Sequence, residues 1–187
     1  MSLFVFFGVN AMLNLPATEK NLMPSLFLKK TIARFFSRPI VQIVIWVAVL
    51  ETLGSLSSLF SMPGPWYVQL SKSTLTPPSY VFPIAWTILY ALLGFYGWSL
   101  WHYYSSPRVL KNVFVVQMLF NLSWSTIFFE FQNVSLALLS IAVMILLTVY
   151  MTIKSMQEAI MTWPVLIPYL GWLIFAYHLT NVIFSRL

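Results

Sequence analysis

The sequence predicts an all-α integral membrane protein, a bundle of five transmembrane helices. The chain has 187 residues, of which 60% are hydrophobic and only 7% charged, and so few charges cannot solvate the surface of a soluble domain. It also contains five apolar segments close to the ~20 residues that a helix needs to cross a bilayer. A closed β-barrel needs short segments of alternating polarity instead, and these continuous apolar runs do not alternate.

Two regions are predicted, a basic amino-terminal tail over residues 1–39 and one membrane domain over residues 40–187. Residues 2–15 are apolar but too short to span a membrane. They are similar to the core of a signal peptide, although the basic segment that precedes such a core is missing. An alternative is that translation starts at Met12 or Met23.

The net charge of +6 is an orientation signal rather than a sign of nucleic-acid binding. Eight of the ten Lys and Arg residues lie in the amino-terminal tail, the second loop and the fourth loop. This bias places the amino terminus in the cytoplasm and the first loop on the opposite side, if the membrane is a bacterial inner membrane. Residues 26–38 alternate bulky apolar with basic side chains, which fits either an amphipathic helix among acidic lipid headgroups or a disordered tail.

Length and apolar content justify each of the five predicted spans, which cover residues 40–60, 79–102, 109–130, 133–154 and 162–184. The connection at residues 131–133 is barely a turn, so the third and fourth spans are predicted to be an antiparallel hairpin. The first loop, residues 61–78, is long and contains several prolines. No internal repeat is present, so an inverted-repeat transporter is not supported.

A carboxylate, Glu51, lies midway along the first span. Charged groups inside a bilayer are costly and commonly functional. Three roles stay open for Glu51: a neutral or hydrogen-bonded structural group, a proton-linked group, or a ligand contact.

The second span carries an aromatic and small-residue stripe. Trp86, Tyr90, Gly94, Gly97 and Trp101 recur at helical spacing and share one face. The stripe fits a packing seam, because small residues let membrane helices approach closely, and Trp101 fits an interfacial aromatic belt. Trp86 is instead predicted to face a ligand.

The third span carries a polar and aromatic stripe made of Gln117, Asn121, Trp124 and Phe128. Two amides inside a membrane must find partners in the bundle interior. They fit an interhelical hydrogen bond, and Asn121 also fits a polar contact to a ligand walled by Trp124 and Phe128.

On the fifth span, Trp172, Ala176 and Thr180 share one face. The small Ala176 fits either a notch for a flat apolar molecule or a close helix crossing. His178 lies about 120° from Trp172 around the helix, so we expect it to face away from any pocket.

Together these segments resemble the TspO/MBR family, the tryptophan-rich sensory proteins and translocator proteins of the peripheral benzodiazepine receptor group. The resemblance covers about residues 40–184. It is carried by Gly54-Ser55, WYxxLxK at 66–72, Pro77-Pro78, WxxLY at 86–90, NxxWxxxFF at 121–129 and PYxxWxxFA at 168–176.

The resemblance implies a five-helix bundle, commonly dimeric, with a pocket that opens toward the first loop and binds porphyrins such as protoporphyrin IX. Animal relatives bind sterols, and isoquinoline and benzodiazepine compounds are synthetic ligands. The implied pocket residues are Trp66, Tyr67, Pro77, Trp86, Asn121, Trp124, Phe128, Trp172 and Ala176. The family usually continues Pro-x-aromatic after Lys72, whereas this chain has Ser73 and Leu75 at those positions, so we expect the loop over the pocket to differ.

The predicted function is a membrane receptor or sensor that holds a flat hydrophobic ligand, foremost a tetrapyrrole, with no required cofactor. One alternative is light-dependent porphyrin degradation, for which the resemblance implicates Trp86 and Trp172. A second alternative is a porphyrin or sterol transporter.

The sequence shows no metal-ligand cluster, phosphate loop or hydrolytic motif, and its cysteine count of zero excludes thiolate chemistry. A bacterial membrane is favoured, with the mitochondrial outer membrane as the alternative location.

Overall fold

The computed structural model describes residues 33–59 and 61–187. The chain forms two compact units, the first ending at Gln42 and the second running from Ile43 to Leu187. In the first unit, residues 33–36 form a helical turn, after which the Ser37 hydroxyl donates to the Arg34 carbonyl at 2.9 Å. The predicted apolar segment 2–15 and most of the predicted interfacial helix lie outside the described residues.

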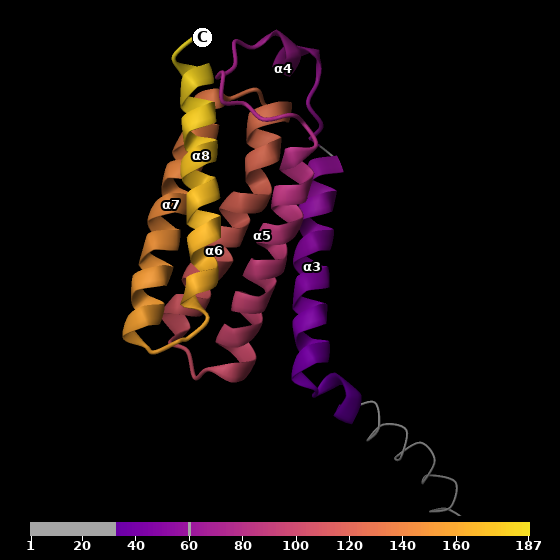
Figure 1. Ribbon diagram of the computed structural model, residues 1–187, viewed down its shortest axis with the longest axis vertical. Helices are drawn as coiled ribbons and strands as arrows, with labels where there is room; N and C mark the ends of the chain where they lie inside the picture. Colours follow the sequence, from indigo (N-terminus) through magenta and orange to yellow (C-terminus); the bar gives the residue numbers. More distant parts are fainter. Residues whose placement is uncertain (1–32, 60) are drawn as a thin grey trace, which may run out of the picture. The chain divides into compact units, whose positions relative to one another are not determined.

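Five helices in the described residues are long and apolar enough to cross a membrane, which confirms the predicted fold class. They are α3 (Pro39–Leu59), α5 (Val81–Trp98), α6 (Arg108–Ser125), α7 (Val134–Gln157) and α8 (Leu166–Phe184). The described residues contain no strand. Successive long helices of the second unit run antiparallel, and the carboxy-terminal end of α8 lies beside the first loop and its short helix α4 (Pro65–Gln69) (Figure 1).

Two of the long helices continue into π-helical turns. The turn η1 (Ser99–Tyr103) ends α5, and η2 (Thr126–Glu130) ends α6. The wide turns are closed by bonds from the Tyr104 amide to the Ser99 carbonyl and from the Phe131 amide to the Thr126 carbonyl, each 2.9 Å. A single 3₁₀ turn, η3 (Trp163–Val165), leads into α8.

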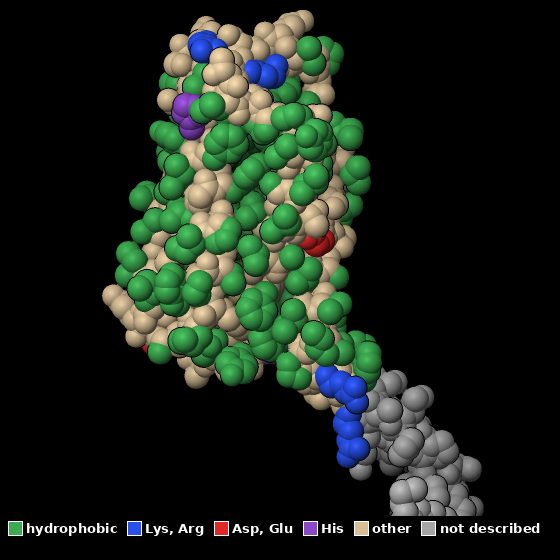
Figure 2. Space-filling model, viewed as in Figure 1, with side chains coloured by type: hydrophobic (Ala, Val, Ile, Leu, Met, Phe, Trp, Pro, Cys, Tyr) green, Lys and Arg blue, Asp and Glu red, His purple; other side chains and the backbone are tan. Residues whose placement is uncertain are grey.

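The outer surface of the helices is apolar. Figure 2 shows hydrophobic side chains over most of the visible helical face, and many large side chains are exposed there, such as Ile84, Leu119 and Leu146 at 57%, 62% and 69%. A water-soluble protein does not expose so continuous an apolar surface. The surface is therefore the one that faces lipid in an integral, multi-pass membrane protein.

Helices α5 to α8 enclose the main core. Its fully buried side chains include Leu93, Tyr96, Met144 and Tyr169. Lipid offers no hydrogen-bond partners, and several polar groups in this core pair with one another: the hydroxyls of Tyr96 and Ser155 lie 2.7 Å apart. The predicted hairpin between the third and fourth spans is present as α6 and α7, and the Asn133 side chain caps α7 by accepting from the Leu136 amide at 2.9 Å.

Helix α3 approaches α5 where the glycines of the predicted stripe lie. A methyl group added to Gly94 would come 2.8 Å from the Val47 Cα, and one added to Gly97 would come 2.9 Å from the Trp46 ring. In return, Gly54 of α3 lies so close to the ring of Tyr90 that an added methyl would overlap it at 2.2 Å. Small residues on both helices therefore make this contact possible.

We predict that Gly94→Ala destabilises the fold, because its methyl group meets the backbone of α3, which cannot rotate away. The expected loss is ~1–3 kcal/mol, typical of overpacking, seen as a lower thermal unfolding midpoint in detergent. Gly171→Ala is the matched control, since nothing lies within 4 Å of a methyl group there. Equal unfolding midpoints for the two variants would contradict the close contact between α3 and α5.

Candidate functional site

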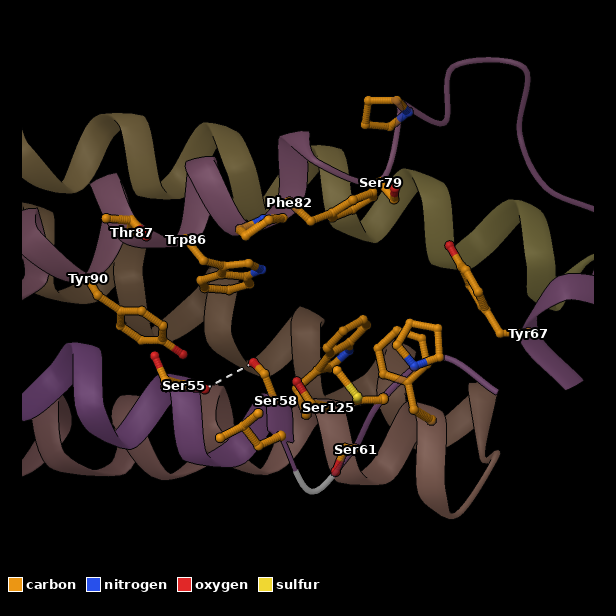
Figure 3. Close-up of a pocket in the computed structure, with 18 of the residues that line it drawn as sticks. Ser55, Ser58, Ser61, Tyr67, Ser79, Phe82, Trp86, Thr87, Tyr90 and Ser125 are labelled. Atoms are coloured by element: carbon orange, nitrogen blue, oxygen red, sulfur yellow. Dashed lines mark hydrogen bonds between the residues drawn. The ribbon is translucent and has the colours of Figure 1, made fainter. Parts of the chain in front are cut away.

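A cavity of about 700 Å³ lies between α3 and α5 and extends to the first loop and the end of α6. Its volume falls within the ~300–1,000 Å³ of typical small-molecule sites. Figure 3 shows Trp86 and Tyr90 of α5 across the cavity from Ser55 and Ser58 of α3, with Tyr67 at the loop end.

The wall formed by α5 is aromatic. The ring of Trp86 stacks on Tyr90 with centroids 5.4 Å apart and planes inclined by 29°, and Phe82 lines the same wall. Behind Trp86, the ring of Trp172 from α8 stands edge-on at 6.4 Å. Trp86 thus offers a planar surface whose angle is fixed by rings on two helices.

A buried hydrogen-bond network holds the inner end of this wall. The Tyr90 hydroxyl donates to Asn121 Oδ1 at 2.7 Å, and Asn121 Nδ2 donates to the Tyr169 hydroxyl at 2.7 Å. Gln117 Nε2 donates to the same Tyr169 hydroxyl. The network joins α5, α6 and α8, so both amides of the predicted polar stripe have an interhelical structural role.

The end of α6 forms a second aromatic wall. Trp124 lines the cavity and stacks on Phe128 at 5.0 Å with nearly parallel rings. Phe129 also lines the cavity, and the π-helical turn places it edge-on to Phe128 at 4.9 Å. Phe128 itself is buried, with 3% exposure.

The first loop covers the cavity at its outer end. Tyr67 of α4 packs edge-on against Phe129 at 5.3 Å, and burial raises the pKa of its phenol, which stays neutral and able to donate. Lys72 Nζ lies 4.5 Å from the Tyr67 ring centroid. Arg186 at the carboxy terminus donates to the Lys72 carbonyl at 2.8 Å, which ties the loop to the end of α8.

The departure from the family pattern after Lys72 has a structural counterpart. The Leu75 amide donates to the Ser73 hydroxyl at 3.2 Å, so a side-chain hydrogen bond shapes this turn in place of a proline. The Leu75 side chain is 62% exposed and does not line the cavity. In this chain the turn after Lys72 is therefore held by a side-chain hydrogen bond, and Leu75 adds no side chain to the cavity lining.

Four of the nine predicted ligand-binding residues line the cavity, namely Tyr67, Pro77, Trp86 and Trp124. The other five support its walls. Trp66 packs edge-on against Phe128 at 5.7 Å, Asn121 and Phe128 are buried behind the lining, and Trp172 and Ala176 pack against the core. Contact of any of the nine with a ligand stays a prediction.

Trp172 lines a separate, smaller hollow of about 290 Å³ between α5 and α8, together with apolar neighbours such as Ile88 and Phe175. His178 is exposed and lines neither space. In the described part of the chain, no group of three His, Cys, Asp or Glu side chains is arranged to hold a metal ion.

The hydroxyl groups that line the cavity were not predicted from the sequence. They come from α3, the first loop, α5 and α6, and are Ser55, Ser58, Ser61, Thr76, Ser79, Thr87 and Ser125. One signal was readable: Glu51, Ser55 and Ser58 follow the spacing i, i+4, i+7 that places them on one helical face. Helices α5 and α6 therefore contribute aromatic rings and one serine or threonine hydroxyl each, whereas α3 contributes two hydroxyls and Glu51.

These features define a class, a multi-pass helical membrane protein with a ligand-sized pocket between its first two spans. The sequence model of the TspO/MBR family matches residues 43–185. The "Tryptophan-rich protein TspO" of Archaeoglobus fulgidus is 34% identical over 154 residues, covering 78% of this chain and 96% of that protein.

Two other relatives match shorter stretches. The "Tryptophan-rich sensory protein" of Cereibacter sphaeroides is 31% identical over 110 residues, 59% of this chain and 69% of that protein. The human "Translocator protein" is 26% identical over 114 residues, 59% of this chain and 68% of that protein. The chain belongs to the TspO/MBR family, as the sequence motifs predicted.

We predict that Tyr169→Phe destabilises the protein because it leaves the amide donors of Gln117 and Asn121 without their shared acceptor. The expected loss is ~1–3 kcal/mol, the range for an unsatisfied buried polar group, measured by thermal unfolding in detergent. Tyr177→Phe is the control, since this tyrosine is on the outer surface with 36% exposure. If both variants unfold at the same temperature, the network contributes nothing to stability.

Proposed function

We propose that the protein is a membrane receptor for flat, largely apolar small molecules, and that tetrapyrroles such as protoporphyrin IX are its ligands. The observation that carries this proposal is the cavity of about 700 Å³ with the indole plane of Trp86 along one side. A planar ring on a fixed wall favours a planar ligand, since offset stacking adds ~0.5–1.5 kcal/mol beyond area burial.

The polar groups of the cavity suit recognition. Pockets that bind small molecules combine apolar walls with a few placed polar groups. Here the hydroxyls of α3 and the loop lie opposite the aromatic wall, and Lys72 at the loop end supplies a positive charge for an acidic substituent. The membrane relatives named for sensing and translocation are consistent with a ligand that partitions into lipid.

We predict that purified protein binds protoporphyrin IX saturably and that Trp86→Leu raises the dissociation constant about tenfold, ~1.4 kcal/mol, because the stacking plane is lost. Trp172→Phe should change it by less than about threefold, since Trp172 touches Trp86 rather than the cavity. The porphyrin absorbance shift on titration in the dark measures both. Trp163→Leu, which lies in η3 and outside the cavity lining, is the control variant.

Absence of saturable binding would remove the proposal. Saturable binding with equal affinity in the wild type and Trp86→Leu would place the ligand elsewhere on the protein.

A second candidate function is light-dependent degradation of the bound porphyrin. It is favoured by the contacts of Trp86 with Tyr90 and Trp172, because all three rings are oxidisable. Trp86 and Tyr90 line the cavity, and Trp172 contacts Trp86 from behind. We expect illumination of the complex to give a new absorbance spectrum that is missing in the dark and in the Trp86→Leu, Trp172→Phe double variant. Stable porphyrin absorbance under light would leave binding as the function.

A further inference from the structure

The cavity has one acidic and one basic side chain in its lining, Glu51 and Lys72. Glu51 lies on α3 seven residues before Ser58, which is about two turns or ~10 Å along the helix. Lys72 belongs to the first loop, at the other end of the cavity. The acidic side chain of the cavity therefore lies at its inner end, midway along a span, and the basic side chain lies at its outer end.

The Glu51 carboxylate has no protein partner among residues 33–59 and 61–187. The ion pair found there joins Lys154 and Glu158 at 2.8 Å, and no hydrogen bond reaches Glu51. Its neighbour on the facing wall, Tyr90, has already donated its hydroxyl to Asn121. A carboxylate at this depth is costly without a partner, and the open cavity is where a partner can enter.

The Lys72 ammonium is held in place by the loop but does not use all of its hydrogen-bond donors. Its ammonium donates to the carbonyls of Val68 at 3.2 Å and Leu70 at 3.3 Å, and lies over the ring of Tyr67. An ammonium group has three N–H donors. Two are used by the loop backbone, so one remains for an acceptor in the cavity.

We propose that Glu51 is the specificity-determining residue of this pocket: it accepts a basic or N–H-donating group at the inner end and turns the acidic edge of an amphipathic ligand toward Lys72. This inference rests on the proposed function, because both concern ligand binding in the same cavity. A tetrapyrrole with both propionates on one edge binds with that edge toward the loop. A ligand with carboxylates on opposite edges is disfavoured, because one of them meets the acidic side chain of Glu51.

The test uses two matched probes with the same flat ring, 1-pyrenemethylamine and 1-pyrenecarboxylic acid. Each is titrated into the full chain in nanodiscs of zwitterionic lipid, with pyrene fluorescence anisotropy as the readout. We expect the wild type to bind the amine about tenfold more tightly than the acid, a difference of ~1.4 kcal/mol. Glu51→Gln, which keeps the size and loses the charge, should abolish this preference.

Two further variants make the test specific. Glu130→Gln removes an acidic residue that does not line the cavity and should leave the preference unchanged. Lys72→Gln should weaken binding of the acid and leave binding of the amine unchanged. Thermal unfolding of each variant shows whether the fold is intact, and Lys72→Gln tests the polarity of the site even if Glu51→Gln fails to fold.

A second ligand pair separates this proposal from the proposed function. Protoporphyrin IX has its two propionates on one edge, and coproporphyrin III has four spread around the ring. We expect Glu51→Gln to reduce the preference for protoporphyrin IX several-fold.

If protoporphyrin IX binds but neither preference depends on Glu51, the specificity proposal is overturned and the proposed function stands. If no porphyrin binds but the preference for the amine depends on Glu51, the specificity proposal stands and the proposed function is overturned. If no probe binds, both fail.

Discussion

The position of Tyr90 is the constraint on which the rest of the site depends. Its ring fills the space left by Gly54 on α3, its hydroxyl bonds to Asn121 on α6, and its face supports Trp86. One side chain thus connects three helices and sets the inner end of the cavity. A side chain at position 54 would push α3 away from α5. Without Asn121, the buried Tyr90 hydroxyl would have no hydrogen-bond partner, because the membrane offers none.

The two sides of the cavity have different physical roles. The aromatic side is rigid, because its rings pack on each other and on the bundle core formed by α5 to α8. The side formed by α3 and the loop contributes hydroxyls and both charges. In the proposed function, the rigid rings select the shape of the ligand, and Glu51 and Lys72 set its orientation. Shape recognition and orientation would then depend on different elements of the fold.

The sequence was sufficient for the spans, because apolar length is what a bilayer requires of a helix. The predicted third span, 109–130, differs by one residue at its start from α6 with its π-helical turn. Helical periodicity also predicted which residues share a face, but not which neighbour that face meets. The interhelical hydrogen bond expected of Asn121 is present, but the sequence did not show that its partners are two tyrosines. The spacing of Ser55 and Ser58 places them on the same helical face as Glu51, but it does not show that this face lines a cavity.

A structure of the protein with protoporphyrin IX bound, determined in a lipid nanodisc, is the sharpest test of the proposed site. We expect the macrocycle to lie against the plane of Trp86 and to face Ser55 and Ser58 of α3, with both propionates beside Lys72. Density for the macrocycle in the smaller hollow between α5 and α8, beside Trp172 and Phe175, with the cavity between α3 and α5 unoccupied, would contradict the proposed binding site.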